Sequence, residues 1–169
     1  ITVGPGVINL RITEHVNAEG YHYAPDPSSQ KACTIGGNVA ENSGGPHTLK
    51  YGVTVNHVLG LEMVLADGEL VTLGANHFGL PGPDLLGLVT GSEGTFGIIT
   101  KIICRLTANP EKAVTLLGIY KSVRDACESV SSIIGHGIIP AAMEMLDKIM
   151  ISAVEKALKP GFPLDAEAV

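Results

Sequence analysis

Two glycine-rich segments carry the residue types that most suggest chemistry. Ile35–Gly45 reads I-G-G-N-V-A-E-N-S-G-G, and Gly91–Gly97 reads G-S-E-G-T-F-G just before an apolar stretch. Because glycine has no Cβ, the backbone can approach a ligand closely, and successive amides can form a concavity that binds an anion. Lys50 is the one cation that accompanies them, so a bound phosphate would rely on amides and helix ends. The competing interpretation is that these glycines only close turns.

Other catalytic patterns are missing from the sequence. The six histidines show neither H-E-x-x-H spacing nor pairing with cysteines, which argues against a zinc site. There is no G-x-S-x-G nucleophile elbow and no G-x-x-x-x-G-K-S/T phosphate loop. Gly4-Pro5-Gly6 follows a strand-like start but lacks the third glycine of a dinucleotide-binding fingerprint, which disfavours a nicotinamide-dependent dehydrogenase.

Composition narrows the class of protein. The 169 residues are 45% hydrophobic, enough apolar mass for one folded domain or slightly more. A net charge of −6 argues against nucleic-acid binding, and no apolar run approaches the ~18 residues of a membrane span. Cys33, Cys104 and Cys127 are odd in number and far apart, which favours a reducing, cytoplasmic compartment. The opening Ile1–Gly6 is not a signal peptide and reads as a chain entering mid-strand, so we expect a piece of a longer protein.

The first hundred residues are expected to mix short helices and strands. A helix capped by Asn9 and ended by Gly20 comes first. A rigid loop follows over residues 24–29, where two prolines prevent regular structure. The remaining expected elements are a helical turn over 38–42, a hairpin over 53–73 with Asp67-Gly68 at its turn, a loop over 76–83, a helix over 84–89 capped by Asp84, and one or two strands over 96–106.

After Asn109-Pro110 the pattern changes, and we place a domain boundary there, between residues 1–108 and 109–169. A strand over 113–120 and a helix opened by Ser122 should be followed by a strand over 141–146 and a helix over 147–158. This order predicts a sheet covered by helices on one face. The predicted fold class is therefore α+β.

Several motifs occur in the order found in one family of flavoenzymes. P-D-P-S-S at 25–29, T-I-G-G-N-V-A-E-N-S-G-G at 34–45, K-Y-G at 50–52, P-D-L-L at 83–86 and G-S-E-G-T-F-G-I-I-T at 91–100 resemble the FAD-linked oxidases of the vanillyl-alcohol oxidase (PCMH) type. Residues 137–147, G-I-I-P-A-A-M-E-M-L-D, resemble the start of that family's C-terminal cap domain. Within the family, the motifs most resemble the branch of glycolate oxidase D subunits and of D-lactate and D-2-hydroxyglutarate dehydrogenases.

The resemblance implies a fold, a cofactor and a set of residues that contact it. Residues 1–108 would be the second subdomain of a PCMH-type FAD-binding domain, and residues 109–169 the first half of a ferredoxin-like cap domain. The residues expected to contact FAD are Pro25, Asp26, Pro27, Ser28, Gly36, Gly37, Asn38, Asn42, Gly44, Gly45, Tyr51, Gly52, Glu93, Gly94, Gly97 and Ile98. Each also has a purely structural interpretation, above all Pro27 and Tyr51. No metal ligand is expected.

Two parts of the family pattern do not occur in this sequence. The glycine-rich pyrophosphate loop, of the form R-G-x-G-T-x-x-x-G, is absent, and the cap-domain histidines would lie beyond Val169. The catalytic base therefore stays unassigned and is expected downstream, and the chain alone is expected to be inactive. His47, beside the glycines, is a further candidate to face the flavin.

The resemblance implies oxidation of a 2-hydroxy acid, glycolate or D-lactate, to the 2-oxo acid with hydride transfer to FAD. The implied partners are the small 2-hydroxy-acid substrate and other subunits of a glycolate oxidase complex, through which the protein could lie peripherally on the inner membrane. Self-association of the chain is also left open. The alternative from a different class is a non-catalytic binding or assembly segment of a multi-subunit flavoenzyme, which turnover would distinguish.

Overall fold

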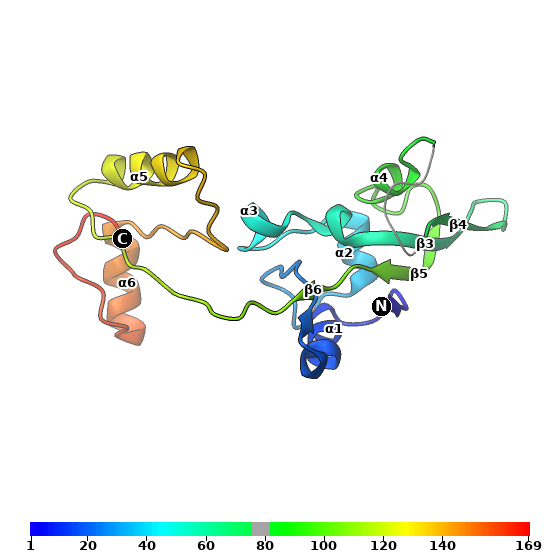
Figure 1. Cartoon of the computed structure of the whole chain (residues 1–169), viewed down its shortest axis with the longest axis horizontal. Helices are drawn as coiled ribbons and strands as arrows, with labels where there is room; N and C mark the ends of the chain where they lie inside the picture. Colours follow the sequence, from blue (N-terminus) through cyan, green and yellow to red (C-terminus); the bar gives the residue numbers. More distant parts are fainter. Residues whose placement is uncertain (76–81) are drawn as a thin grey trace. The chain divides into compact units, whose positions relative to one another are not determined.

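An antiparallel sheet of four strands supports the first part of the chain (Figure 1). Its order is β1-β5-β3-β4, and in that order the strands span Thr2–Val3, Ile98–Cys104, Val58–Val64 and Leu70–Gly74. Strands β3 and β4 form the predicted hairpin. Gly68 at its turn has φ +88°, a left-handed conformation that glycine adopts without strain.

The described residues of the computed structural model are 1–75 and 82–169. They divide into two compact units, Ile1–Pro110 and Glu111–Val169. Most of the loop predicted over 76–83, including His77, lies outside the described residues. Among the helices of the described ranges, none is long and apolar enough to cross a membrane.

The core of the first unit lies between the sheet and two helices, α1 (Asn9–Val16) and α2 (Ile35–Glu41). Leu61 of β3 pairs with Ile102 of β5, and both side chains are almost fully buried. The other buried members are Ile12, Tyr23, Ile35, Val39, Val58, Met63, Val89 and Cys104. Burial raises the pKa of the Cys104 thiol to about 12, so this cysteine packs as an apolar side chain.

Short elements connect the sheet and the helices. They are η1 (Asn17–Glu19), β2 (Tyr21–His22), α3 (Thr48–Tyr51), η2 (Thr54–His57), α4 (Leu85–Val89) and β6 (Thr107–Ala108). Strands β2 and β6 pair as a separate antiparallel ribbon. Asp84 caps α4 as predicted, because its Oδ1 accepts a 2.9 Å hydrogen bond from the Gly87 amide.

The second unit contains two helices, α5 (Val123–Gly135) and α6 (Lys148–Leu158), both close to their predicted positions. Each begins with a side-chain cap: Ser122 Oγ accepts from the Asp125 amide, and Asp147 Oδ1 accepts from the Met150 amide. Ile151 of α6 packs with Ala166 and Val169 in a small separate core.

The two strands predicted for this unit, over 113–120 and 141–146, do not form. Tyr120 and Asp147 each make one isolated bridge, in both cases to Ala168. Within the described residues each segment is paired only at its end, where Tyr120 and Leu146 exchange backbone hydrogen bonds with residues 167–169, whereas a strand is stabilised by pairing along its length. The side chains of Val114 and Leu116 consequently remain 69% and 88% exposed. The part of the prediction that made these segments into a sheet under two helices is therefore wrong for the described residues.

Candidate functional site

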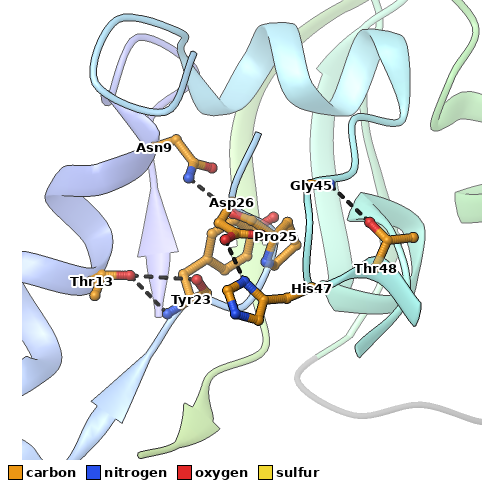
Figure 2. A network of polar contacts seen from close by, with 8 residues as sticks. All are labelled: Asn9, Thr13, Tyr23, Pro25, Asp26, Gly45, His47 and Thr48. Carbon is orange, nitrogen blue, oxygen red and sulfur yellow. Dashed lines mark hydrogen bonds and ion pairs between the residues drawn. The ribbon is translucent and has the colours of Figure 1, made fainter. Parts of the chain in front are cut away.

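The Pro25–Ser28 loop is held by its prolines and by one buried asparagine. Pro25 and Pro27 are buried, Asp26 is half-buried and Ser28 is exposed. Asn9 Nδ2 donates a 3.0 Å hydrogen bond to the Pro25 carbonyl oxygen (Figure 2). The expectation that Asn9 caps the first helix is wrong, because α1 begins at Asn9 itself and its side chain points into the interior.

Asn38 connects α2 to this loop through Asn9. Its Nδ2 donates to Asn9 Oδ1 at 2.7 Å, and both asparagines are at most 2% exposed. Thr34 caps α2 by accepting a 3.3 Å hydrogen bond from the Gly37 amide, so the helix starts earlier than the turn predicted over 38–42. Helix and loop, both predicted to contact the cofactor, are thereby fixed to each other.

The amides at the start of α2 are already paired within the chain. Ile35 donates to Val7 at 2.8 Å, Gly36 to Pro5 at 2.9 Å, and Asn38 to Thr34 at 3.0 Å, all to carbonyl oxygens. With the bond from Gly37 to the Thr34 hydroxyl, the first turn has no free donor. The interpretation that this turn offers amides to a phosphate is therefore wrong, and its contribution is the shape of its surface.

Most of the predicted cofactor-contacting glycines are required by the packing of the chain itself. A Cβ built on Gly36 would lie 2.7 Å from Pro5 Cβ, closer than real Cβ contacts. A Cβ on Gly45 would overlap the backbone and the carboxylate of Asp26. Three others are crowded in the same way, Gly44 by Thr48, Gly52 by Asn56 and Gly97 by Val64. Gly36, Gly45 and Gly97 meet backbone atoms and Gly52 has a φ of +83°, so these four positions would need glycine whether or not a cofactor binds, whereas Gly44 meets only side-chain atoms.

Two predicted glycines, Gly37 and Gly94, are not crowded, but Gly94 has a φ of +75° that itself favours glycine, whereas Gly37 is helical. Gly37 is exposed, and a Cβ built on it would meet only Thr34 Oγ1, at an ordinary 3.4 Å. Glycine inside a helix is roughly 1 kcal/mol less favourable than alanine. No contact within the described residues accounts for glycine here, so the surface above Gly37 is open to close approach by another molecule.

The second glycine-rich segment docks on the end of α2. The Gly91 amide donates to the Val39 carbonyl at 2.8 Å, and the Glu93 amide donates to the Ala40 carbonyl at 2.9 Å. Glu93 and Gly94 are exposed and both have positive φ, +53° and +75°. The two glycine-rich segments, distant in sequence, therefore form one continuous surface.

The predicted residues Asn42, Gly94 and Ile98 differ in how accessible they are. Asn42 ends α2 with φ +51°, and its Oδ1 accepts a 2.9 Å hydrogen bond from the Val55 amide. Gly94 has open space around it, and its amide makes no hydrogen bond to the described residues. Ile98 is 73% exposed, which is unusual for an isoleucine at the start of a strand. Gly94 and Ile98 are thus accessible, whereas Asn42 is occupied in holding the backbone.

Tyr51 lies among three histidines. The rings of His22 and His47 have centroids 5.9 and 6.5 Å from that of Tyr51. His57 Nε2 donates a 2.9 Å hydrogen bond to the Tyr51 carbonyl oxygen, which places the proton of the neutral ring on Nε2. Nδ1 of His57 is buried and has no partner among the described residues, and this burial lowers the pKa of the ring.

Asp26 pairs with His47 (Figure 2). The distance from Asp26 Oδ2 to His47 Nδ1 is 2.6 Å, and the two side chains are 20% and 42% exposed. The other carboxylate oxygen, Oδ1, is buried and has no hydrogen-bond partner among the described residues. This pair joins the Pro25–Ser28 loop to the segment that ends at Tyr51 and Gly52.

Two contributions to this arrangement were missed by sequence reasoning. Asn9 looks like a helix cap in the sequence, and no local pattern indicates that its side chain is buried between Asn38 and Pro25. Thr90, just before Gly91, was also not singled out: its amide donates a 2.9 Å hydrogen bond to the Leu86 carbonyl oxygen, and its buried Oγ1 has no partner in the described part of the chain. No group of three or more His, Cys, Asp or Glu side chains that could hold a metal ion occurs within residues 1–75 and 82–169.

Two segments of the chain match known protein families. Residues 1–74 match the FAD binding domain family, and residues 109–169 match the C-terminal domain of FAD linked oxidases. Among solved structures, alkyldihydroxyacetonephosphate synthase superposes with a TM-score of 0.76 at 22% identity, over 99% of this chain and 33% of that one. The mixed α+β arrangement is thus found within part of a solved structure.

Curated relatives agree with these matches. The chain is 50% identical to glycolate oxidase subunit GlcD of Escherichia coli K12 and 47% identical to that of Bacillus subtilis 168, over 99% of its length in each case. It is 35% identical to a D-lactate dehydrogenase of Anaerostipes hadrus, also over 99% of its length. The chain spans about a third of the length of these relatives: 34%, 36% and 35%. Residues 1–74 therefore belong to the FAD binding domain family, and residues 109–169 belong to the family of C-terminal domains of FAD linked oxidases.

Proposed function

We propose that the chain is part of a flavin-dependent enzyme that oxidises a 2-hydroxy acid of the glycolate or D-lactate type to the 2-oxo acid. Residues 1–108 would form the second subdomain of a PCMH-type FAD-binding domain, and residues 109–169 the beginning of the ferredoxin-like cap domain. The proposal is supported by the names of the relatives, glycolate oxidase subunit and D-lactate dehydrogenase. The cofactor is proposed from the family of residues 1–74.

The open surface above Gly37 is the observation that carries the proposal. A bound FAD needs backbone that no side chain covers. Gly37 provides such backbone, and no contact among the described residues requires a glycine at this position. Gly94 adds an amide that is available as a donor. The residues present are therefore compatible with a flavin dinucleotide that lies along α2 and the loop docked on it.

The predicted contact residues then divide by role. Gly37 and Gly94 would approach the cofactor directly, and Ser28, Glu93 and Ile98 are exposed and would be accessible to it. A second group of residues is packed or hydrogen-bonded within the chain and would form the wall of the proposed FAD site, here called the cofactor wall. These residues are Pro25, Asp26, Pro27, Gly36, Asn38, Asn42, Gly44, Gly45, Tyr51, Gly52 and Gly97. FAD, when bound, would supply the hydride acceptor, and the chain would supply position and exclusion of water.

The proposal is tested with the full-length protein. FAD should bind stoichiometrically in a titration, and glycolate or D-lactate should reduce an electron-accepting dye in its presence, with L-lactate as the stereochemical control. Protein that binds no FAD would contradict the cofactor assignment. FAD binding without turnover of any 2-hydroxy acid would favour the alternative, a non-catalytic assembly segment of a flavoenzyme.

We also propose association with other subunits of a glycolate oxidase complex, with peripheral location on the inner membrane through them. Relatives bearing the name glycolate oxidase subunit support this. The apolar side chains of Leu116 and Ile119, 88% and 62% exposed, are compatible with a surface that another polypeptide covers. Size-exclusion chromatography of the protein alone, and after co-expression with the neighbouring subunits, would separate self-association from a mixed complex.

A further inference from the structure

A chain of hydrogen bonds ties together three segments of the proposed cofactor wall. Asn38 of α2 bonds to Asn9, and Asn9 bonds to the carbonyl oxygen of Pro25. The next residue, Asp26, bonds to His47, which directly precedes α3. Asn9 and Asn38 are 1% and 2% exposed, whereas the side chains of Asp26 and His47 are 20% and 42% exposed. Figure 2 shows the bonds from Asn9 to Pro25 and from Asp26 to His47.

Asp26 depends on His47 for its orientation. Pro25 and Pro27 restrict the backbone of Asp26 on both sides. Gly45 has no Cβ, which would otherwise overlap Asp26, so the Asp26 side chain fits at one position beside Gly45. At this position Asp26 Oδ1 is buried without a hydrogen-bond partner among the described residues, and Asp26 Oδ2 is bonded to His47 Nδ1 at 2.6 Å. Among the described residues His47 is therefore the donor that holds this carboxylate, and a carboxylate deprived of its donor is costly to keep in place.

We propose that His47 is a positioning residue of the flavin site: by holding Asp26, it clamps the Pro25–Ser28 loop against the Gly44–Gly52 segment and so preserves the wall on which FAD lies. The inference rests on the proposed function and goes beyond it, since the sequence names His47 only as a candidate to face the flavin and gives it no role through Asp26. Only Nδ1 is needed for the clamp. Nε2 makes no hydrogen bond to the described residues.

Because the clamp uses one nitrogen, two substitutions separate it from other roles of the ring. Asparagine places an N–H donor near the position of Nδ1, so His47→Asn should retain the bond to Asp26. His47→Leu fills similar volume without a donor and should release it. Lys101→Leu is the matched control, since it removes a comparable pair, Lys101 Nζ to Glu62 Oε2 at 2.9 Å, with side chains 58% and 22% exposed, from the sheet.

The measured quantity is the dissociation constant of FAD from the full-length protein, determined by titrating the apoprotein and monitoring the quenching of flavin fluorescence. The visible circular dichroism of the bound flavin is a second readout. We expect His47→Leu to weaken FAD binding by about 10- to 100-fold, the loss of one charge-assisted hydrogen bond, and to alter the dichroism. His47→Asn should restore affinity to within about threefold of wild type, and Lys101→Leu should change neither readout.

Several outcomes would overturn the proposal. One is unchanged FAD affinity and dichroism in a folded His47→Leu protein; another is failure of His47→Asn to rescue binding. Absence of FAD binding by the wild-type protein would instead contradict the proposed function, which keeps the two failures distinguishable.

Discussion

Replacing Gly37 by alanine should move stability and cofactor affinity in opposite directions. The added methyl group would meet only Thr34 Oγ1, at 3.4 Å, so it causes no clash within the described residues. Alanine also loses less backbone entropy than glycine on entering a helix, which is worth roughly 0.5–1 kcal/mol. The apoprotein with Gly37→Ala should therefore resist urea better than the wild type, by about that free energy of unfolding.

The same methyl group should weaken FAD binding. If the cofactor lies against the bare backbone at Gly37, a methyl there must displace it, and a misfit of about 1.4 kcal/mol already costs tenfold in affinity. Gly37→Val, with its branched Cβ, should lose most of the flavin that co-purifies while its far-ultraviolet circular dichroism stays nearly unchanged. Absorbance of the purified protein gives the occupancy, and titration of the apoprotein gives the affinity.

Gly36→Ala is the matched control one residue earlier. Its Cβ would lie 2.7 Å from Pro5 Cβ and 3.0 Å from the Pro5 carbonyl oxygen, so the backbone must shift. We expect it to lower the free energy of unfolding by about 1–3 kcal/mol, the usual cost of overpacking. Full flavin occupancy in both Gly37 variants would refute the assignment of this surface to the cofactor, and destabilised Gly37→Ala apoprotein would refute the packing argument.

Three further outcomes are expected. Asn9→Ala should lower the free energy of unfolding in urea by about 2–4 kcal/mol, because the Pro25 carbonyl oxygen and Asn38 Nδ2 each lose a hydrogen-bond partner. A loss under about 1 kcal/mol would contradict the buried network. Burial lowers the pKa of His57 below its ordinary value of 6.5, so just below that pH the unfolded state binds more protons than the folded state. The free energy of unfolding should therefore fall as the pH is lowered through this window, and His57→Gln should make it depend less on pH. Limited proteolysis should cut near Asn109-Pro110, at the boundary of the two compact units, sooner than inside the hairpin; first cleavage in the hairpin would argue against a separable second unit.

The sequence was sufficient wherever structure is determined by neighbouring residues. Ser122 and Asp84 cap their helices as predicted, because a cap involves only the next three residues. The hairpin with its turn at Gly68 is local in the same sense. Prediction was poorer where the outcome depends on distant residues. The segment 113–120 has strand-like composition, yet in the described part of the chain its one β-bridge joins Tyr120 to Ala168.

For the site, sequence motifs indicated which segments matter but not how they are connected. Asp26 was singled out from its motif, whereas its bond to His47 spans 21 residues and leaves no periodic signal. The glycines illustrate the same limit. Gly36 and Gly37 are indistinguishable in the sequence, and only the position of Pro5 reveals that one is needed for packing and the other is not.

The way the Gly91–Gly94 loop attaches to α2 determines how this region can open. Helix α2 has seven residues, two of them glycine, so it would not persist alone and depends on the burial of Ile35 and Val39. The Gly91 and Glu93 amides bond to carbonyls of its last turn, so these bonds break whenever that turn unwinds. Helix end and loop therefore form one cooperative unit, whose amides should exchange with deuterium together and slow together when a ligand covers the surface they share.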